Sequence, residues 1–139
     1  MKETGVKHIN PTGIFDPTPF AFCHSVQVPS QANLVFISGQ SGGVGEGHLL
    51  AEDFASQVKS ALENLQIILE SHAATPAHVV KITVLIVDHN PQKLEIWTSM
   101  AKEFWKGYDL PASTLIPVPT LALPGMLIEV DAIAAVSEY

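Results

Sequence analysis

Apolar and polar positions alternate with a period of two along the first part of the chain, and this is the pattern of β-strands. It predicts a short strand over Val6–Asn10, a second over Phe22–Val28 and a strong third over Asn33–Gly39. A short turn around Ser-Gln-Ala-Asn joins the second and third strands. We therefore expect these two strands to form an antiparallel hairpin.

The period becomes helical between Glu52 and His72, where apolar residues return every three or four positions. The stripe comprises Phe54, Val58, Ala61, Leu62, Leu65, Ile68 and Leu69. Pro76 prevents further helix, because proline lacks the backbone donor. A second helix is predicted after Asn90, the expected N-cap, and Gly107 is expected to end it. Its stripe comprises Leu94, Trp97, Met100, Ala101, Phe104 and Trp105, which we assign to the core.

An almost wholly apolar strand over His78–Val87 lies between the helices, and strands over Ser113–Val118 and Leu127–Ser137 follow them. Such an apolar run suits a central strand that is covered on both faces. The order β-β-β-α-β-α-β-β predicts one α/β (α+β) domain over residues 1–139, with a six-stranded mixed sheet and two helices on one face. No third helix remains for the other face, so we expect a homo-oligomer to bury it. The low charged fraction, 15%, supports that expectation.

The net charge of −7 and the absence of arginine limit the partners of the protein. Nucleic-acid binding needs clustered cations, whereas the seven lysines are scattered, so no nucleic-acid partner is expected. Without arginine, no site in this chain holds a carboxylate with the two-pronged guanidinium fork. The apolar runs have the length of strands and the N-terminus has no apolar leader, so we expect no membrane insertion and a cytoplasmic location.

Cysteine, histidine and glycine each suggest a chemistry that their spacing does not support. Cys23 is the single cysteine, which excludes an internal disulfide. It cannot pair with His24, because adjacent strand residues point to opposite faces. The six histidines, among them His48, show no metal-ligand spacing, so no metal is expected. The segment Ser-Gly-Gly-Val-Gly-Glu-Gly lacks the spacing and the lysine of a phosphate-binding loop, and we interpret it as a flexible connection.

Five stretches of the chain carry a resemblance to a known family. They are LVFISGQ (Leu34–Gln40), ALENLQIILESHAA in the first predicted helix, HVVKITVLIVD (His78–Asp88), LPAS (Leu110–Ser113) and IEVDAIAAV (Ile128–Val136). In this order they resemble the RidA/YjgF family, the reactive intermediate deaminases once called L-PSP endoribonucleases. The resemblance implies a homotrimer of chorismate-mutase-like subunits with clefts for small carboxylates between neighbours. It also implies hydrolysis of enamines or imines, such as 2-aminoacrylate, without a metal or organic cofactor.

One position departs from the family pattern. The deaminating branch has Pro-Ala-Arg-Ser where this chain has Pro111-Ala112-Ser113-Thr114, so Ser113 replaces the arginine that would hold the substrate carboxylate. Each charge-assisted hydrogen bond of such a pair contributes roughly 1.5–3 kcal/mol. Serine donates one neutral hydrogen bond instead, which suits a carbonyl, an amide or a hydroxyl. We therefore expect a substrate other than 2-aminoacrylate.

Three further positions match the family site. Glu129 corresponds to the glutamate that holds the attacking water, although a solvated strand glutamate on the same face as Asp131 is the alternative. Lys81 corresponds to the basic residue of the Val-Val-Lys strand, either as a substrate contact or as an interface ion pair. Gly39 lies in the Ser-Gly-Gln turn, whose backbone borders the cleft.

The other candidates for substrate binding are Phe22, Cys23, Thr98, Ser113 and Thr114. The family tyrosine falls at Phe22 or Cys23, depending on where an insertion is aligned. Thr98 stands where some relatives carry asparagine. Ser113 and Thr114 point to opposite faces of their strand, so one of them is expected to face the cleft.

These residues leave two functions open and oppose a third. The leading hypothesis is a trimeric hydrolase that deaminates an enamine or imine other than 2-aminoacrylate, with Glu129 in its site. The alternative is a trimer that binds a small ligand or regulates without catalysis, because the arginine is absent. The acidic charge opposes the ribonuclease activity that the older family name suggests.

Overall fold

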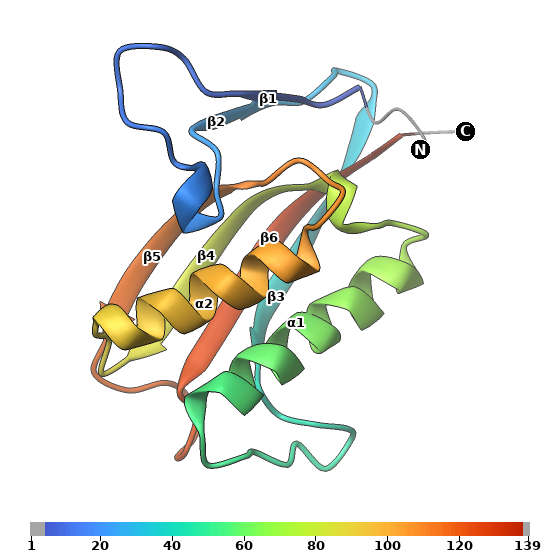
Figure 1. Cartoon of the computed structure of the whole chain (residues 1–139). Coiled ribbons are helices and arrows are strands. Elements are labelled where there is room, and N and C mark those ends of the chain that lie inside the picture. Colours follow the sequence, from blue (N-terminus) through green and yellow to red (C-terminus); the bar gives the residue numbers. More distant parts are fainter. Residues whose placement is uncertain (1–4, 138–139) are drawn as a thin grey trace.

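The computed structural model describes residues 5–137, and this part of the chain contains six strands and two α-helices, arranged as in Figure 1. The strands are β1 (Lys7–Ile9), β2 (Ser25–Gln27), β3 (Ala32–Ser41), β4 (Val79–Val87), β5 (Ala112–Val118) and β6 (Ile128–Ser137). The helices are α1 (Phe54–Ser71) and α2 (Pro91–Phe104). The order of elements is the predicted one, and the bounds differ from the expectation by a few residues.

Four strands form the main sheet, in the order β3-β6-β4-β5. Strand β6 runs antiparallel to β3 and to β4, whereas β4 and β5 are parallel. Parallel neighbours need a crossover connection, which α2 provides. Both helices lie across the same face of the sheet (Figure 1), as the two apolar stripes predict.

Strands β1 and β2 form a separate two-stranded ribbon, so the six strands divide into two and four instead of making one continuous sheet. The expected hairpin between β2 and β3 was wrong. The amide of Ala32 donates to the carbonyl of Pro29 over 3.1 Å, and this tight turn directs β3 into the main sheet. Pro29 also has no amide for a ladder. A single bridge between Cys23 and Ala112 ties the ribbon to the edge of β5.

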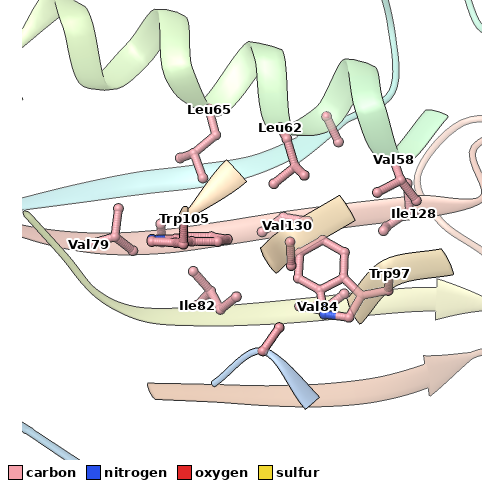
Figure 2. Close-up of a cluster of buried hydrophobic side chains, with 14 of the residues drawn as sticks. Val58, Leu62, Leu65, Val79, Ile82, Val84, Trp97, Trp105, Ile128 and Val130 are labelled. Atoms are coloured by element: carbon pink, nitrogen blue, oxygen red, sulfur yellow. The ribbon is translucent and has the colours of Figure 1, made fainter. Parts of the chain in front are cut away.

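The core lies between the helices and the main sheet. Figure 2 shows Leu62 and Leu65 of α1 pointing toward the strands, with the ring of Trp97 from α2 and that of Trp105, the residue after α2, on the same side of the sheet. Both tryptophans are buried, which confirms that they belong to the core. The Trp105 indole donates to the carbonyl of Pro76 over 3.1 Å, so its one polar atom is satisfied.

The other face of the sheet is left open by this chain. Leu34 and Phe36 of β3 are 50% and 73% exposed, and Phe36 pairs in register with Ile133 of β6. Paired residues share a face, so apolar side chains from two strands lie together there. Contiguous apolar surface of this kind is typical of an interaction site.

Candidate functional site

Glu129 lies on the open face of the sheet, near one end of β6. Its neighbours Ile128 and Val130 are fully buried on the helix side, so alternation turns Glu129 the other way. Strand β3 has a register shift between Ile37 and Gln40, beside Gly39. A Cβ atom at Gly39 would overlap the Glu129 carboxylate, so glycine is what lets this side chain lie against the backbone.

Glu129 lines a pocket of about 370 Å³. Its wall includes Gly39, Ser41, His48 and Asn64, and Leu123 and Met126 add an apolar side. The glycine-rich segment, interpreted from sequence as a flexible connection, forms part of this wall. The pocket therefore combines a carboxylate, a hydroxyl and an imidazole in one space.

The hydroxyl of Ser41 and the imidazole of His48 are hydrogen-bonded to each other. Ser41 Oγ lies 2.5 Å from His48 Nε2, and the amide of Gly43 donates to the same hydroxyl over 3.2 Å. Ser41 also pairs in register with Glu129, and such partners in an antiparallel ladder share a face. Ser41 therefore shares a strand face with Glu129 and is hydrogen-bonded to His48.

Two amides of α1 hold the chain around this pocket. Asn64 donates to the carbonyls of Ser41 and Gly43 over 3.0 and 2.8 Å. Gln57 is fully buried and donates to the carbonyls of Ala51 and Gly125 while it accepts from the amide of Leu127; the three lengths are 2.7, 2.8 and 2.9 Å. The side chains of one helix thus fix the loops before and after the pocket.

Ser113 belongs to a second pocket. It pairs in register with Ile82, a core residue, so Ser113 points to the helix-covered side of the sheet, whereas Thr114 pairs with Thr83 and points to the open face. Ser113 lines a space of about 320 Å³ at the β5 edge. The other lining residues are Phe15, Phe20, Phe22, Leu94, Trp97 and Leu115. None of the described residues that line it is charged.

The comparisons with known proteins decide the family. The family model described as Endoribonuclease L-PSP matches residues 18–136, nearly the whole chain. This chain belongs to the RidA/YjgF family.

Relatives of two kinds support this assignment to the RidA/YjgF family. The 2-iminobutanoate/2-iminopropanoate deaminase of Rattus norvegicus is 38% identical over 111 residues, which are 76% of this chain and 77% of the relative. A solved structure from Yersinia pestis, described as a protein of unknown function of the conserved Rid family, is 33% identical. It covers 95% of this chain and 99% of its own, with a TM-score of 0.90. The likeness thus extends over the whole fold.

In this RidA/YjgF member, the other predicted site residues on the open face contact one another. The Lys81 ammonium donates to Thr114 Oγ1 over 2.9 Å and to the carbonyl of Ile82 over 3.1 Å. Within residues 5–137, Lys81 makes no salt bridge. Asp131 accepts from the amide of Thr83 over 3.0 Å, a local contact on the exposed side. Both predicted roles of Lys81 remain predictions.

Phe22 and Cys23 lie on opposite sides of the segment that joins the β5 edge. Phe22 lines the Ser113 pocket, whereas Cys23 is buried and its thiol donates to the carbonyl of Ser25 over 3.4 Å. Burial raises the pKa of the Cys23 thiol above its ordinary value. Thr98 bonds back to the carbonyl of Glu95 in its own helix and lines none of the pockets described above. The geometry therefore favours Phe22 over Cys23 as the substrate-binding candidate.

Sequence reasoning missed four polar residues around Glu129: Ser41, His48, Gln57 and Asn64. For the two amides a signal was present. Gln57 comes three positions after Phe54, and Asn64 comes three positions after Ala61, so both lie within the apolar stripe of α1. Gln57 is buried and Asn64 is half-buried, and polar side chains at such helical positions need hydrogen-bond partners, which here are mainly backbone carbonyls. For Ser41 and His48 the sequence spacing offered no comparable signal.

Within residues 5–137, no three His, Cys, Asp or Glu side chains gather as metal ligands would. Neither described helix combines the length and the apolar character that crossing a membrane requires.

Proposed function

We propose that this protein hydrolyses a neutral imine or enamine to a carbonyl compound and ammonia, at clefts between the subunits of a homotrimer. The observation that carries the proposal is the position of Glu129, whose carboxylate lies against Gly39 inside a polar pocket. The family assignment and the deaminase relative from Rattus norvegicus support the same reaction class. A positioned carboxylate of this kind contributes roughly 10²–10⁴-fold as a general base.

In the proposed hydrolysis, the main role of the protein is to activate water. Glu129 takes a proton from water as the water oxygen bonds to the carbon of the C=N group. The π electron pair moves to nitrogen, which takes a proton from solvent and gives the carbinolamine. The nitrogen then takes the proton held by Glu129 and leaves as ammonia, and the carbinolamine hydroxyl returns a proton to solvent as the carbonyl forms. Each step balances without an oxidant, a reductant or a metal.

The Ser113 pocket supports a neutral, apolar substrate group. Aromatic and aliphatic side chains surround Ser113 where the deaminating branch has its arginine, and the chain has no arginine elsewhere. A substrate carboxylate buried there without a partner would lose its hydration at a cost of several kcal/mol. One serine hydroxyl suits a single neutral hydrogen bond, and the rings suit an aromatic or branched alkyl group.

The two pockets lie on opposite sides of one sheet, so a shared site needs two subunits. Glu129 points to the open face, and Ser113 points to the helix-covered side at the β5 edge. Burial of the exposed Leu34 and Phe36 side chains would favour binding of another copy at the open face. We infer that a neighbour's β5 edge brings its Ser113 pocket to the Glu129 pocket of the first subunit.

A matched pair of imines tests the proposal. A flavin amine oxidase generates the neutral imine of 2-phenylethylamine, and an L-amino-acid oxidase generates the imine of phenylalanine, which differs by one carboxylate. Semicarbazide trapping follows the disappearance of each imine. We expect wild-type protein to accelerate hydrolysis of the neutral imine and Glu129→Gln to lose that acceleration. Unchanged rates with Glu129→Gln, or no acceleration of any imine by the wild type, would overturn the proposal.

The second candidate is a trimer that binds a small ligand without turning it over, and the missing arginine favours it. A thermal-shift screen of neutral amides, ketones and imine analogues would then find ligands that raise the melting temperature. Stable ligands that are recovered unchanged, together with inactivity in the imine assay, would support this function. Consumption of those ligands would exclude it.

A further inference from the structure

Glu129 has two chemically active neighbours in its pocket that the reaction outlined above does not use. Ser41 is buried, pairs in register with Glu129 and is bonded to His48 Nε2 over 2.5 Å. Both side chains line the pocket. We propose that Ser41 and His48 are the second proton-transfer group of this site: His48 exchanges protons with the substrate nitrogen through the Ser41 hydroxyl. The inference rests on the proposed imine hydrolysis.

The hydrogen bonds around Ser41 fit both protonation states of the imidazole. A serine hydroxyl has one proton to donate and two lone pairs that accept. When His48 is protonated, its Nε2–H and the amide of Gly43 both donate to Ser41 Oγ, which leaves the serine proton free to point into the pocket. When His48 is neutral with a bare Nε2, the serine proton turns to His48. The pair is therefore ready to pass a proton in either direction.

The backbone is arranged to hold the imidazole in place. A Cβ atom at Gly43 would overlap the His48 ring, so glycine there makes room for it. His48 itself has a φ of 50°, a left-handed conformation that non-glycine residues adopt at a cost. Two hydrogen bonds between Val44 and Leu49 close the loop behind it, at 2.9 and 3.1 Å. Strained residues held by their surroundings cluster at functional sites.

His48 is also exposed to solvent, although its Nε2 points to a buried serine. Exposure lets the ring exchange protons with bulk water between turnovers. The geometry thus connects solvent, imidazole, hydroxyl and pocket in one line, beside the carboxylate that activates water.

The proton transfers balance over a full turnover. As the water oxygen bonds to carbon, Glu129 takes one water proton, and the nitrogen receives the Ser41 proton, which His48 replaces. The carbinolamine then breaks its C–N bond, and the nitrogen takes the proton held by Glu129 and leaves as ammonia. The carbinolamine hydroxyl gives its proton through Ser41 to His48, and the carbonyl forms. Imine and water are consumed, ammonia and carbonyl are released, and both side chains return to their starting states.

Three variants test the relay in the imine assay. His48→Asn keeps a side chain that tolerates the left-handed conformation and bonds to Ser41, but it carries no exchangeable charge. We expect kcat to fall about 10–100-fold with little change in KM, since one of two proton-transfer groups is lost. Ser41→Ala should lower kcat by a similar factor. His48→Gly suits the same backbone, and added imidazole should restore at least part of its rate.

Glu46→Gln is the matched control, because it changes a charge of the same loop outside the pocket, and it should leave kcat unchanged. If His48→Asn and Ser41→Ala keep the wild-type kcat while Glu129→Gln is inactive, the relay is overturned and the proposed function stands. Loss of activity in His48→Gly without rescue by imidazole would also overturn the relay, because a merely structural role gives that result. A wild type that hydrolyses no imine overturns both inferences.

Discussion

The Glu129 pocket and the Ser113 pocket differ in chemistry more than in size. The Glu129 pocket holds a carboxylate, a hydroxyl and an imidazole in about 370 Å³, and the side-chain amides of Gln57 and Asn64 in α1 hold its loops. The Ser113 pocket, of about 320 Å³, is lined by aromatic and aliphatic side chains around one hydroxyl. The groups suited to proton transfer are thus separated from the surface suited to substrate recognition.

Under the proposed function, this separation would let the family scaffold keep its chemistry where Ser113 stands in place of the arginine. The residues proposed to activate water depend on the register shift of β3 beside Gly39 and on α1, and neither Gly39 nor a residue of α1 lines the Ser113 pocket. A change in the Ser113 pocket therefore alters what is bound without disturbing the carboxylate. The comparison predicts that recognition and reaction can be changed independently, and that they meet only between subunits.

The largest expected effect comes from separating the pockets genetically. Glu129→Gln disables one pocket and Ser113→Trp fills the other, so each variant alone should lose activity by roughly 10²-fold or more. When the two are co-expressed, random mixing pairs two intact halves at about one interface in four of a cyclic trimer. We expect about a quarter of the wild-type imine-hydrolysis rate to return.

The control places both substitutions in one chain and co-expresses it with wild type. A site between subunits again gives about a quarter of the rate, whereas a site within one chain gives about half. A site within one chain would also give no recovery in the first mixture. That pair of results would contradict the shared site, and size-exclusion chromatography with light scattering would show whether the mixed trimers form.

A smaller effect is expected when the missing anchor is restored. Ser113→Arg should lower KM for the phenylalanine-derived imine about 10–100-fold, because two charge-assisted hydrogen bonds contribute roughly 1.5–3 kcal/mol each before desolvation. Ser113→Lys is the matched control, since a point charge lacks the two-pronged geometry, and it should gain less. Equal KM values for wild type and Ser113→Arg would show that the substrate carboxylate does not reach this pocket.

Phe22 and Cys23 provide a narrower test at the same pocket. Phe22 lines it, whereas Cys23 turns into the protein interior. Phe22→Ala should raise KM for the neutral imine about tenfold, as expected for the loss of roughly 1–2 kcal/mol of aromatic contact. Cys23→Ala should change KM much less. A larger effect from Cys23→Ala, in steady-state kinetics on folded protein, would reverse the choice between the two residues.

The sequence carried most of the fold and only part of the site. Local signals determined the elements: Asn90 caps α2 as expected, with its side chain 2.8 Å from the amide of Lys93. Pairing between strands is not local, and for this reason the predicted partner of β2, which was β3, was wrong. Glu129 and Ser113 followed from the resemblance, but their separation onto two faces required the register of β4 with β5 and β6.

The interaction of His48 with Ser41 shows why the remaining site residues could not be predicted from the sequence. His48 and Ser41 are seven positions apart in a loop without periodicity, so no pattern predicts that their side chains meet. The contact depends on a left-handed residue and on a missing Cβ at Gly43, which are properties of the folded backbone. Sequence alone presents this segment as glycine-rich and polar, which is equally typical of a flexible loop.

The smallest expected effect concerns the reactivity of Cys23, which lies behind the Ser113 pocket. Burial raises the pKa of its thiol, so at neutral pH the thiolate fraction is smaller than in an unfolded chain. Iodoacetamide should therefore label the native protein slowly, and the rate should rise with pH only above the ordinary thiol range. Mass spectrometry of native and urea-unfolded samples measures both rates. Fast labelling of the native protein at neutral pH would mean that the Cys23 thiol is accessible from the Ser113 pocket. That pocket would then contain a nucleophile, which would contradict the contrast with the Glu129 pocket.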